Sequence, residues 1–260
     1  MVVKYRLGRC LEMLTDERHA VIQNLLHKSG IVKTQDLMNI LNCSESTIRR
    51  DLDQLEKEGY LKRIHGGAKR VYQLDEELTT QEKSFKNIQE KQIIGKFAAS
   101  LIEENEVIYL DAGTTTLAMI DFIQVGNITV VTNGIQHASL LSDYHINTIL
   151  LGGNIKASTK AMIGSTSLRN LESYRFDKAF IGINGIDQEF GCTTPDPEEA
   201  AIKKLAIEQS ANSFIVADQS KWNKVNFVRV CDIDDVSIIT NLGDLDLTSY
   251  RENTTILEAK

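Results

Sequence analysis

Two adjacent arginines, Arg49 and Arg50, follow a short run of hydroxyl side chains in this 260-residue sequence. A helix turns about 100° per residue, so a helix here would place Ile48, Leu52 and Leu55 on one face and Arg50 on the opposite face. Such a helix can bury its apolar side while it presents guanidinium and hydroxyl groups near its N-terminus. Those groups can donate hydrogen bonds to phosphates and base edges, which is what a helix in the major groove of DNA requires.

The flanking residues predict the rest of a winged helix-turn-helix domain. A first helix ends at Ser29-Gly30, and Thr34 can N-cap a second helix with Leu37, Ile40 and Leu41 on its inner face. Ser44 can cap the third helix, and residues 60–71 predict two short strands around a Gly-Gly turn, which would form a basic wing. The alternative is a small helical domain with a solvated arginine pair, but a capped basic helix followed by a basic wing favours nucleic-acid binding.

Charge divides the chain in the same way. The whole sequence has 29 Lys and Arg against 36 Asp and Glu, a net charge of −7. Residues 1–70 hold 13 basic and 9 acidic residues (+4), and the remainder holds 16 and 27 (−11), which together give −7. A basic front part on an acidic body indicates that one end of the chain meets phosphates.

Length and composition predict two domains in a cytoplasmic protein. We expect a poorly ordered extension over residues 1–12, the winged helix-turn-helix over 13–71, a linker over 72–87 and an effector and oligomerisation domain over 88–260. No apolar run is long enough to span a membrane, and no secretory signal is visible. The four cysteines lack CxxC spacing and the five histidines form no metal-spaced pair, so neither a metal nor another cofactor is expected.

From residue 88 onward, short apolar runs alternate with helical stretches, which predicts an α/β domain with a mostly parallel sheet. Ligands of open α/β sheets bind outside the carboxyl ends of the strands. The strand candidates end in loops rich in small, hydroxylated and amide residues, which would suit a polyhydroxy ligand. The predicted strands span residues 107–110, 128–132, 146–151, 178–183, 213–217 and 236–240.

The stretch from Asp111 to Thr116 is a candidate phosphate site. Gly113 would allow close approach of the backbone, and Thr114, Thr115 and Thr116 offer hydroxyl and N–H groups at a helix start. The alternative is an ordinary strand-to-helix turn with a threonine cap. Two other loops remain open: Asp218 to Lys221 could supply a carboxylate and a cation, and residues 191–199 could form either a stiff lip over the site or only a capped helix start.

At this point the sequence resembles the DeoR-type family of bacterial sugar-metabolism repressors. The resemblance rests on Ser44 to Leu52 with His65-Gly66-Gly67-Ala68, and on Leu110 to Thr115, Val131-Thr132-Asn133, Leu151-Gly152-Gly153, Phe180-Ile181-Gly182 and Asp218 to Lys221. It implies a winged-helix repressor whose C-terminal domain is similar to ribose-5-phosphate isomerase and binds a phosphorylated sugar as inducer. The stretches 111–120 and 193–201 are most similar to the fructose-operon branch, whose inducer is fructose 1-phosphate.

The resemblance also implies which residues act, and the caps and loops above extend that set. The predicted DNA-contact residues are Thr34, Ser44, Ser46, Thr47, Arg49, Arg50, Arg63, His65, Gly66, Gly67 and Lys69. The predicted effector-site residues are Asp111, Gly113, Thr114, Thr115, Thr116, Asn133, Gly152, Gly153, Asn184, Asp218 and Lys221. Asn241 is left out because the family more often has Thr-Asp where this chain has Thr240-Asn241.

Two hypotheses of different class follow. The first is a repressor, not an enzyme, that binds double-stranded operator DNA as a homo-oligomer, a dimer or a tetramer, and is released by a phosphorylated sugar. The second is a sugar-phosphate isomerase with an appended DNA-binding head. It would need a carboxylate base and a cation, for which Asp218, Glu198, Glu199 and Lys221 are candidates, but the sequence shows no stretch like the catalytic one of that isomerase.

Overall fold

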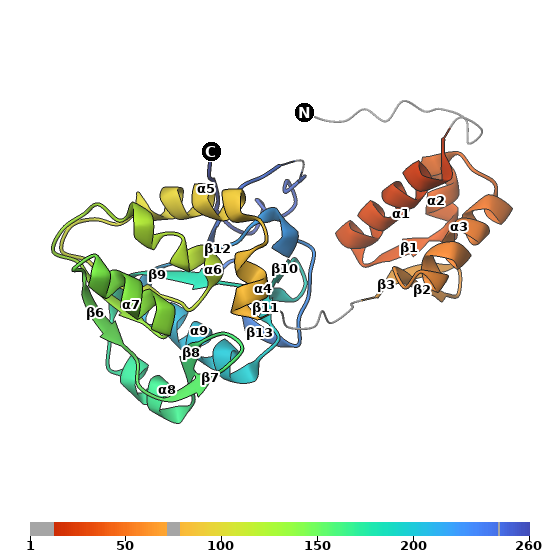
Figure 1. The fold of residues 1–260 in the computed structure, drawn as a ribbon. Helices are drawn as coiled ribbons and strands as arrows, with labels where there is room; N and C mark the ends of the chain where they lie inside the picture. Colours follow the sequence, from red (N-terminus) through yellow and green to blue (C-terminus); the bar gives the residue numbers. More distant parts are fainter. Residues whose placement is uncertain (1–12, 72–78, 244) are drawn as a thin grey trace. The chain divides into compact units, whose positions relative to one another are not determined.

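The computed structural model describes residues 13–71, 79–243 and 245–260, and the chain divides into two units after Tyr72 (Figure 1). The predicted extension over residues 1–12 and most of the predicted linker lie outside the described residues. The first unit contains three helices and three strands in its described part. They are α1 (Thr15–Ser29), β1 (Ile31–Lys33), α2 (Thr34–Leu41), α3 (Glu45–Lys57), β2 (Leu61–Ile64) and β3 (Gly67–Arg70).

These elements form the predicted winged helix-turn-helix. α1 ends at Gly30, whose φ of +66° suits glycine and whose N–H donates to the Leu26 carbonyl (2.9 Å). α2 and α3 are joined through Asn42, which is in the left-handed region (φ 50°). The wing strands β2 and β3 form an antiparallel hairpin, and β1, which was not predicted, pairs with β3 to complete a three-stranded sheet.

The core of this unit confirms most of the predicted helix faces. The buried apolar side chains include Ile22 and Leu26 of α1, Leu37 and Leu41 of α2, and Ile48, Leu52 and Leu55 of α3. Two details of α2 differ from prediction. Ile40 is 52% exposed, because only the row of Leu37 and Leu41 faces the other helices. Thr34 is the first helical residue and Lys33 is the N-cap, so the predicted cap at Thr34 was wrong.

The second unit is built on a seven-stranded sheet in the order β15-β14-β12-β9-β4-β5-β6, and every pairing within it is parallel. The six predicted strands are six of its seven members. Its strands are β4 (Val107–Leu110), β5 (Thr129–Thr132), β6 (Asn147–Leu150), β9 (Phe176–Gly182), β12 (Ser210–Val216), β14 (Ser237–Thr240) and β15 (Ile256–Glu258).

Helices cover both faces of this sheet, which explains why its strands read as continuous apolar runs. Successive residues of one strand enter opposite cores: Ile108 and Leu110 of β4 pack on one side, and Tyr109 packs on the other. Figure 1 shows α5 and α8 on opposite sides of the sheet. The helical elements of this unit are α4 (Thr80–Ser84), α5 (Ile88–Ala99), α6 (Thr114–Leu117), η1 (Ile120–Phe122), α7 (Ile135–Asp143), α8 (Ser165–Glu172), α9 (Pro197–Glu208) and η2 (Gln219–Lys221).

Two small antiparallel sheets were not predicted from the sequence. Their strands have three or four residues each, which is too short for a clear alternation of apolar and polar side chains. One pairs β7 (Asn154–Lys156) with β8 (Ala161–Ile163), and the other has β11 (Gly191–Thr194) between β10 (Gly185–Asp187) and β13 (Val228–Cys231).

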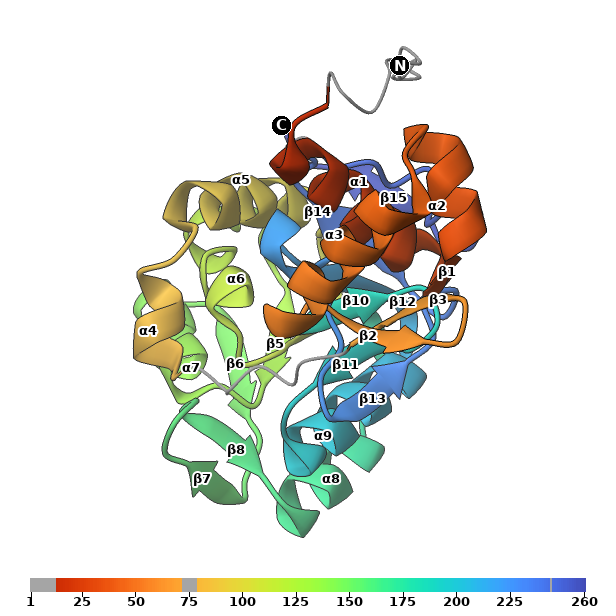
Figure 2. The same cartoon turned by 90° about the vertical axis from the view of Figure 1, so that its right-hand side faces the viewer.

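Residues 79–87 were predicted as linker, but they belong to the second unit. Thr79 caps α4 reciprocally with Glu82: its hydroxyl accepts from the Glu82 N–H (3.2 Å), and the Glu82 carboxylate accepts from the Thr79 N–H (2.8 Å). Thr80 attaches this helix to the domain through bonds to the Ser158 and Thr159 carbonyls, both 2.9 Å. α4 also contacts α6 (Figure 2).

Candidate functional site

The N-terminus of α3 gathers polar side chains on the exposed face of the first unit. The Ser44 hydroxyl accepts from the Thr47 N–H (3.3 Å) and lies 2.9 Å from the hydroxyls of Ser46 and Thr47. Arg49 and Arg50 are both exposed, and Arg49 pairs with Glu45 one turn earlier (2.5 Å). An exposed ion pair of this kind is weak, so the Arg49 guanidinium can exchange Glu45 for a phosphate.

The buried face of α3 carries a charge that the sequence did not reveal. Asp51 is buried, and both its carboxylate oxygens accept from the Arg18 guanidinium at 2.9 Å. His19 lies 3.5 Å from the same carboxylate. The hydrogen bond to Asp51 raises the pKa of Arg18. This bidentate pair fixes α3 against α1, so the neighbouring Arg50 is held on the outer face.

The wing is attached to α3 and to the start of α2. Arg63 uses its N–H to bond Glu56 (2.7 Å) and its guanidinium to bond Asp53, so this predicted DNA contact braces the wing. The Thr34 N–H donates to the Gly66 carbonyl (2.8 Å) at the wing turn. His65, Gly66 and Lys69 are exposed.

Gly67 was predicted to contact DNA, and the structure shows that it also allows two strands to pack closely. It is buried, and a Cβ at this position would lie 2.0 Å from the Val32 carbonyl oxygen. Glycine is therefore required for β3 to approach β1, and the turn itself is His65-Gly66, with Gly66 at φ +79°.

The second unit has a cavity at the carboxyl edge of its parallel sheet. β4 and β9 are neighbours there, and from this pair the chain runs outward to β5 and β6 on one side and to β12, β14 and β15 on the other. This reversal is the topological switch point at which open α/β sheets bind ligands. The cavity is lined by Thr80, Lys83, Lys86, Asn87, Lys91, Asp111, Ala112, Gly113, Thr114, Thr115, Thr159, Gly182, Ile183, Asn184, Glu199, Lys203, Val216, Asp218, Ser220 and Lys221.

Asp111 joins the two central strands and α9 at the base of the cavity. Its carboxylate accepts from the Gly182 N–H of β9 (3.0 Å) and from the Lys203 ammonium (2.5 Å). Asp111 and Lys203 are both buried. Gly113 and Gly182 make this close approach possible, because a Cβ on Gly182 would lie 3.3 Å from the Asp111 carboxylate and 3.6 Å from the Gly113 Cα.

Of the residues predicted for the effector site in this loop, Gly113, Thr114 and Thr115 line the cavity and Thr116 does not. Thr116 is fully buried, and its hydroxyl lies 2.5 Å from the Asp111 carbonyl and 3.1 Å from His137 Nε2. His137 Nε2 is also 3.1 Å from the Gly113 carbonyl. Burial lowers the pKa of His137 to about 4, so the imidazole is neutral where it contacts Gly113 and Thr116.

Asn133, Gly152 and Gly153 were predicted to line the site, and the structure places them outside the cavity lining. The Asn133 side chain accepts from the Ala112 N–H (2.9 Å), so it supports the loop without facing the cavity. Gly152 accepts from the Ser167 hydroxyl of α8 (2.6 Å), and a Cβ on Gly153 would lie 2.3 Å from that hydroxyl oxygen. These residues follow β5 and β6, which are farther from the switch point than β4.

Asn184, Asp218 and Lys221, which were predicted for the effector site, all line the cavity. Asn184 accepts from the Thr194 hydroxyl (3.0 Å). The Asp218 carboxylate is buried and accepts from the Ser220 N–H (2.9 Å) and from the Asn87 amide (3.0 Å).

The sequence-based set missed most of the cationic side chains of this cavity. Lys83, Lys86 and Lys91 come from the predicted linker and the start of α5. Lys203 follows Glu199 by four residues, so both lie on one face of α9. That spacing could have suggested that both side chains face the same site, but nothing in the sequence places Lys203 opposite Asp111. The lining holds five lysines against three carboxylates, Asp111, Glu199 and Asp218, which gives the cavity a positive balance.

Residues 191–199 were predicted to form either a stiff lip over the site or only a capped helix start. Asp196 caps α9 by accepting from the N–H groups of Glu198 and Glu199, both at 2.9 Å, and Pro197 is the first helical residue. The loop is therefore a strand followed by a capped helix start. Within this stretch, Glu199 lines the cavity, and its carboxylate accepts from the Thr159 hydroxyl (2.6 Å).

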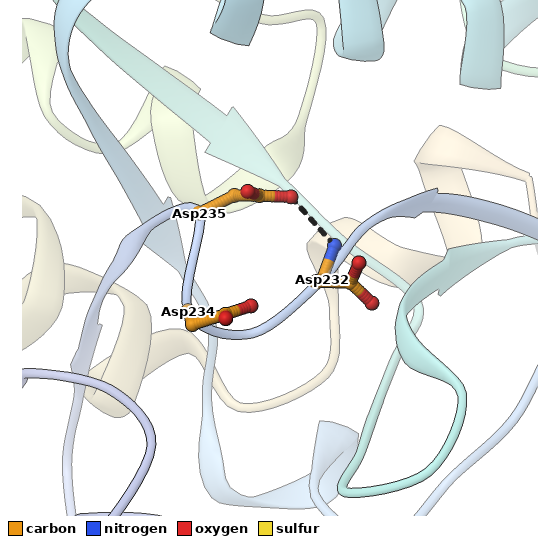
Figure 3. Close-up of side chains that lie close together, drawn as sticks. All are labelled: Asp232, Asp234 and Asp235. Carbon is orange, nitrogen blue, oxygen red and sulfur yellow. Dashed lines mark hydrogen bonds between the residues drawn. The ribbon is translucent and has the colours of Figure 1, made fainter.

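Within the described residues, one acidic cluster is close enough to hold a metal ion: Asp232, Asp234 and Asp235 (Figure 3). All three are exposed, the Asp235 carboxylate accepts from the Asp232 N–H (2.9 Å), and Asp232 pairs with Arg229. A solvated loop accounts for this cluster. No helix in the described part of the chain has the length and apolar character that a membrane crossing requires.

The fold and the two sites define a two-unit regulator: a winged helix-turn-helix on a parallel α/β domain that carries a polar ligand cavity. Comparison with known proteins supports this two-unit architecture. Residues 18–73 match the DeoR-like helix-turn-helix domain, and residues 86–241 match the DeoR C-terminal sensor domain. The chain belongs to the DeoR family of helix-turn-helix transcriptional regulators.

Two similar relatives are curated regulators. The HTH-type transcriptional regulator FruR of Bacillus subtilis is 47% identical over 250 residues, which cover 95% of this chain and 100% of FruR. The lactose phosphotransferase system repressor of Staphylococcus epidermidis is 33% identical, over 86% of this chain and 91% of that protein. Among solved structures, ribose-5-phosphate isomerase A from Methanocaldococcus jannaschii aligns with a TM-score of 0.40 and 17% identity over 52% of this chain and 55% of that one.

Proposed function

We propose that this protein represses a sugar-utilisation operon and that a phosphorylated sugar, bound in the cavity of the second unit, releases it from its operator. The observation that carries the proposal is the lining of that cavity. Five lysines, two threonine hydroxyls at the start of α6 and several side-chain amides and carboxylates meet at the switch point of the sheet. Ammonium and backbone N–H groups suit a phosphate, and amide and carboxylate oxygens suit sugar hydroxyls.

In this proposal the predicted DNA contacts of α3 and the wing bind the operator. Exposed Ser44, Ser46, Arg49 and Arg50 supply donors to phosphates and base edges, and exposed His65 and Lys69 add wing contacts. One such head makes few contacts, so a homo-oligomer on paired half-sites is expected. The name of one relative, the lactose phosphotransferase system repressor, supports a sugar operon. Because residues 111–120 and 193–201 resemble the fructose-operon branch, fructose 1-phosphate is the first effector to test.

Release requires that the effector bind the DNA-free arrangement better than the DNA-bound one. The test is a gel shift with DNA from upstream of the protein's own operon, titrated with a panel of phosphorylated and unphosphorylated sugars. One phosphosugar should release the DNA at micromolar to millimolar concentration, and its unphosphorylated form should not. Operator binding that no phosphosugar alters would contradict the proposed effector.

The isomerase alternative is tested by the same materials. Two of the candidate residues named above line the cavity and already have partners: Asp218 accepts from the Ser220 N–H and the Asn87 amide, and Glu199 accepts from the Thr159 hydroxyl. We therefore propose that the cavity binds its ligand without converting it. Incubation with ribose 5-phosphate, ribulose 5-phosphate and fructose 1-phosphate should leave each sugar unchanged, whereas catalytic turnover of any of them would favour the enzyme.

A further inference from the structure

One wall of the cavity is made by the chain segment that leads into the second unit. This connecting segment, residues 79–87, contributes Thr80, Lys83, Lys86 and Asn87 to the lining. It is the first described part of the second unit after the winged helix-turn-helix and residues 72–78. A ligand in the cavity would therefore touch the part of the second unit that follows residues 72–78 in the chain.

Lys91 ties the connecting segment to the cavity. Lys91 is 7% exposed, lines the cavity, and donates its ammonium to the backbone carbonyls of Lys83 and of Lys86 (2.7 Å). An ammonium has three N–H donors, so these two bonds leave a third that can serve a ligand. At the end of the segment, the Asn87 amide donates to the Asp218 carboxylate on another wall (3.0 Å).

The charge around Lys91 is arranged so that an anion would change these bonds. Burial lowers the pKa of Lys91, the Asp218 carboxylate opposes that effect, and the charges of Lys221 and Lys83 add to it. An anionic group in the cavity would offset the repulsion among these lysines and favour the ammonium form. An anionic group that accepts from the third Lys91 N–H would hold the ammonium in the position from which it donates to the two carbonyls.

We infer that Lys91 is a positioning residue that converts binding of an anionic ligand into a tighter hold on residues 79–87, and that this tightening is what the DNA-binding unit receives. The inference rests on the proposed function, because it names how the same cavity acts. Lys91 then contributes both to ligand affinity and to the response. A lysine that only stabilised the fold would not affect how ligand binding changes operator affinity.

The experiment compares Lys91→Met with Lys96→Met, which removes an exposed lysine from the same helix. Hydrogen exchange is measured on peptides covering residues 79–90, with and without saturating fructose 1-phosphate, and with inorganic phosphate as the minimal anion. In the wild type and Lys96→Met, fructose 1-phosphate should slow exchange in this segment several-fold and release operator DNA. Lys91→Met should bind the sugar phosphate about tenfold more weakly, as expected for loss of a charge-assisted bond.

At saturating ligand, Lys91→Met should show neither the protection nor the release, and Lys91→Arg, which keeps the charge and donors, should restore part of both. Asn87→Gly is a second variant that does not touch the lysine. Asn87 has φ +53°, which glycine adopts freely, so the variant removes the side-chain bonds to Asp218 (3.0 Å) and Ser220 (3.4 Å) without straining the backbone. It should speed exchange of the segment without ligand and weaken release.

The outcomes separate the two proposals. Release of Lys91→Met and of Asn87→Gly from the operator at the wild-type level, once saturated with ligand, would overturn the role given to Lys91 while leaving the proposed function intact. A wild-type protein that binds the operator but neither fructose 1-phosphate nor any other phosphosugar would overturn the proposed function, and this inference with it.

Discussion

The exposed guanidinium groups of Arg49 and Arg50 are the side chains on which operator binding should depend most. Replacing both with alanine removes donors to phosphates and base edges but leaves the buried face of α3 intact. Each such contact contributes about 1–3 kcal/mol. We therefore predict at least a thirtyfold loss of operator affinity in a gel shift, with phosphosugar binding unchanged.

Arg169→Ala is the matched control, because Arg169 is an exposed arginine on α8 of the second unit. It should bind the operator as tightly as the wild type. An Arg49→Ala, Arg50→Ala double variant that binds equally well would show that α3 is not the recognition helix.

The buried imidazole of His137 should make the second unit less stable in mild acid. Burial lowers the pKa of His137 from 6.5 to about 4, so the folded chain keeps it neutral while the unfolded chain protonates it below pH 6.5. The stability linked to this residue is present above pH 6.5 and is lost as the pH falls towards 4. Between pH 7 and pH 5, the free energy of unfolding should fall by about 2 kcal/mol more in the wild type than in His137→Gln.

Urea unfolding followed by the fluorescence of Trp222 measures this difference, because Trp222 is the only tryptophan and is buried in the second unit. His145→Asn serves as control, since His145 is exposed. It should keep the wild-type dependence on pH. The same dependence in His137→Gln would refute the role given to the buried imidazole.

At the scale of elements, the wing depends on the close approach of β3 to β1. A methyl group on residue 67 would meet the Val32 carbonyl, and the obstacle is backbone, which cannot rotate away as a side chain can. We predict that Gly67→Ala destabilises the first unit by about 1–3 kcal/mol, as overpacking does elsewhere. Amide hydrogen exchange in β1 and β3 should accelerate, and operator binding should weaken.

Lys69→Ala, on the same strand with an exposed side chain, separates packing from charge. Its β1 and β3 amides should exchange at the wild-type rate, while operator affinity falls modestly. Unchanged exchange in Gly67→Ala would mean that β1 does not depend on glycine at this position.

At the scale of the whole molecule, the basic front part and the acidic body make operator binding a salt-dependent property. Residues 1–70 carry +4 and the rest −11, so phosphate contacts should come from the first unit. With roughly six to ten phosphate contacts per oligomer, affinity should fall about 10³- to 10⁵-fold between 50 and 200 mM salt. Filter-binding titrations across this range measure the slope, and an affinity that does not change with salt would contradict phosphate contact.

Much of this architecture could be predicted from the sequence because local patterns decide it. The apolar spacing of Leu52 and Leu55, the cap at Ser44 and the stop at Gly30 each act within one or two turns of helix. Alternating apolar runs and helices likewise predicted a parallel sheet, and the rule that ligands bind at its carboxyl edge placed Asp111, Asn184 and Asp218 in one cavity.

The tertiary structure decided which strand ends meet and which charges they share. Strand order cannot be read along the chain, so Asn133 and Gly152 could not be separated in advance from Gly113, although β5 and β6 lie away from the switch point. The pairs Arg18–Asp51 and Asp111–Lys203 join residues 33 and 92 positions apart. Lys91 was missed for the same reason: burial beside a cavity is a property of packed neighbours, which only the folded chain brings together.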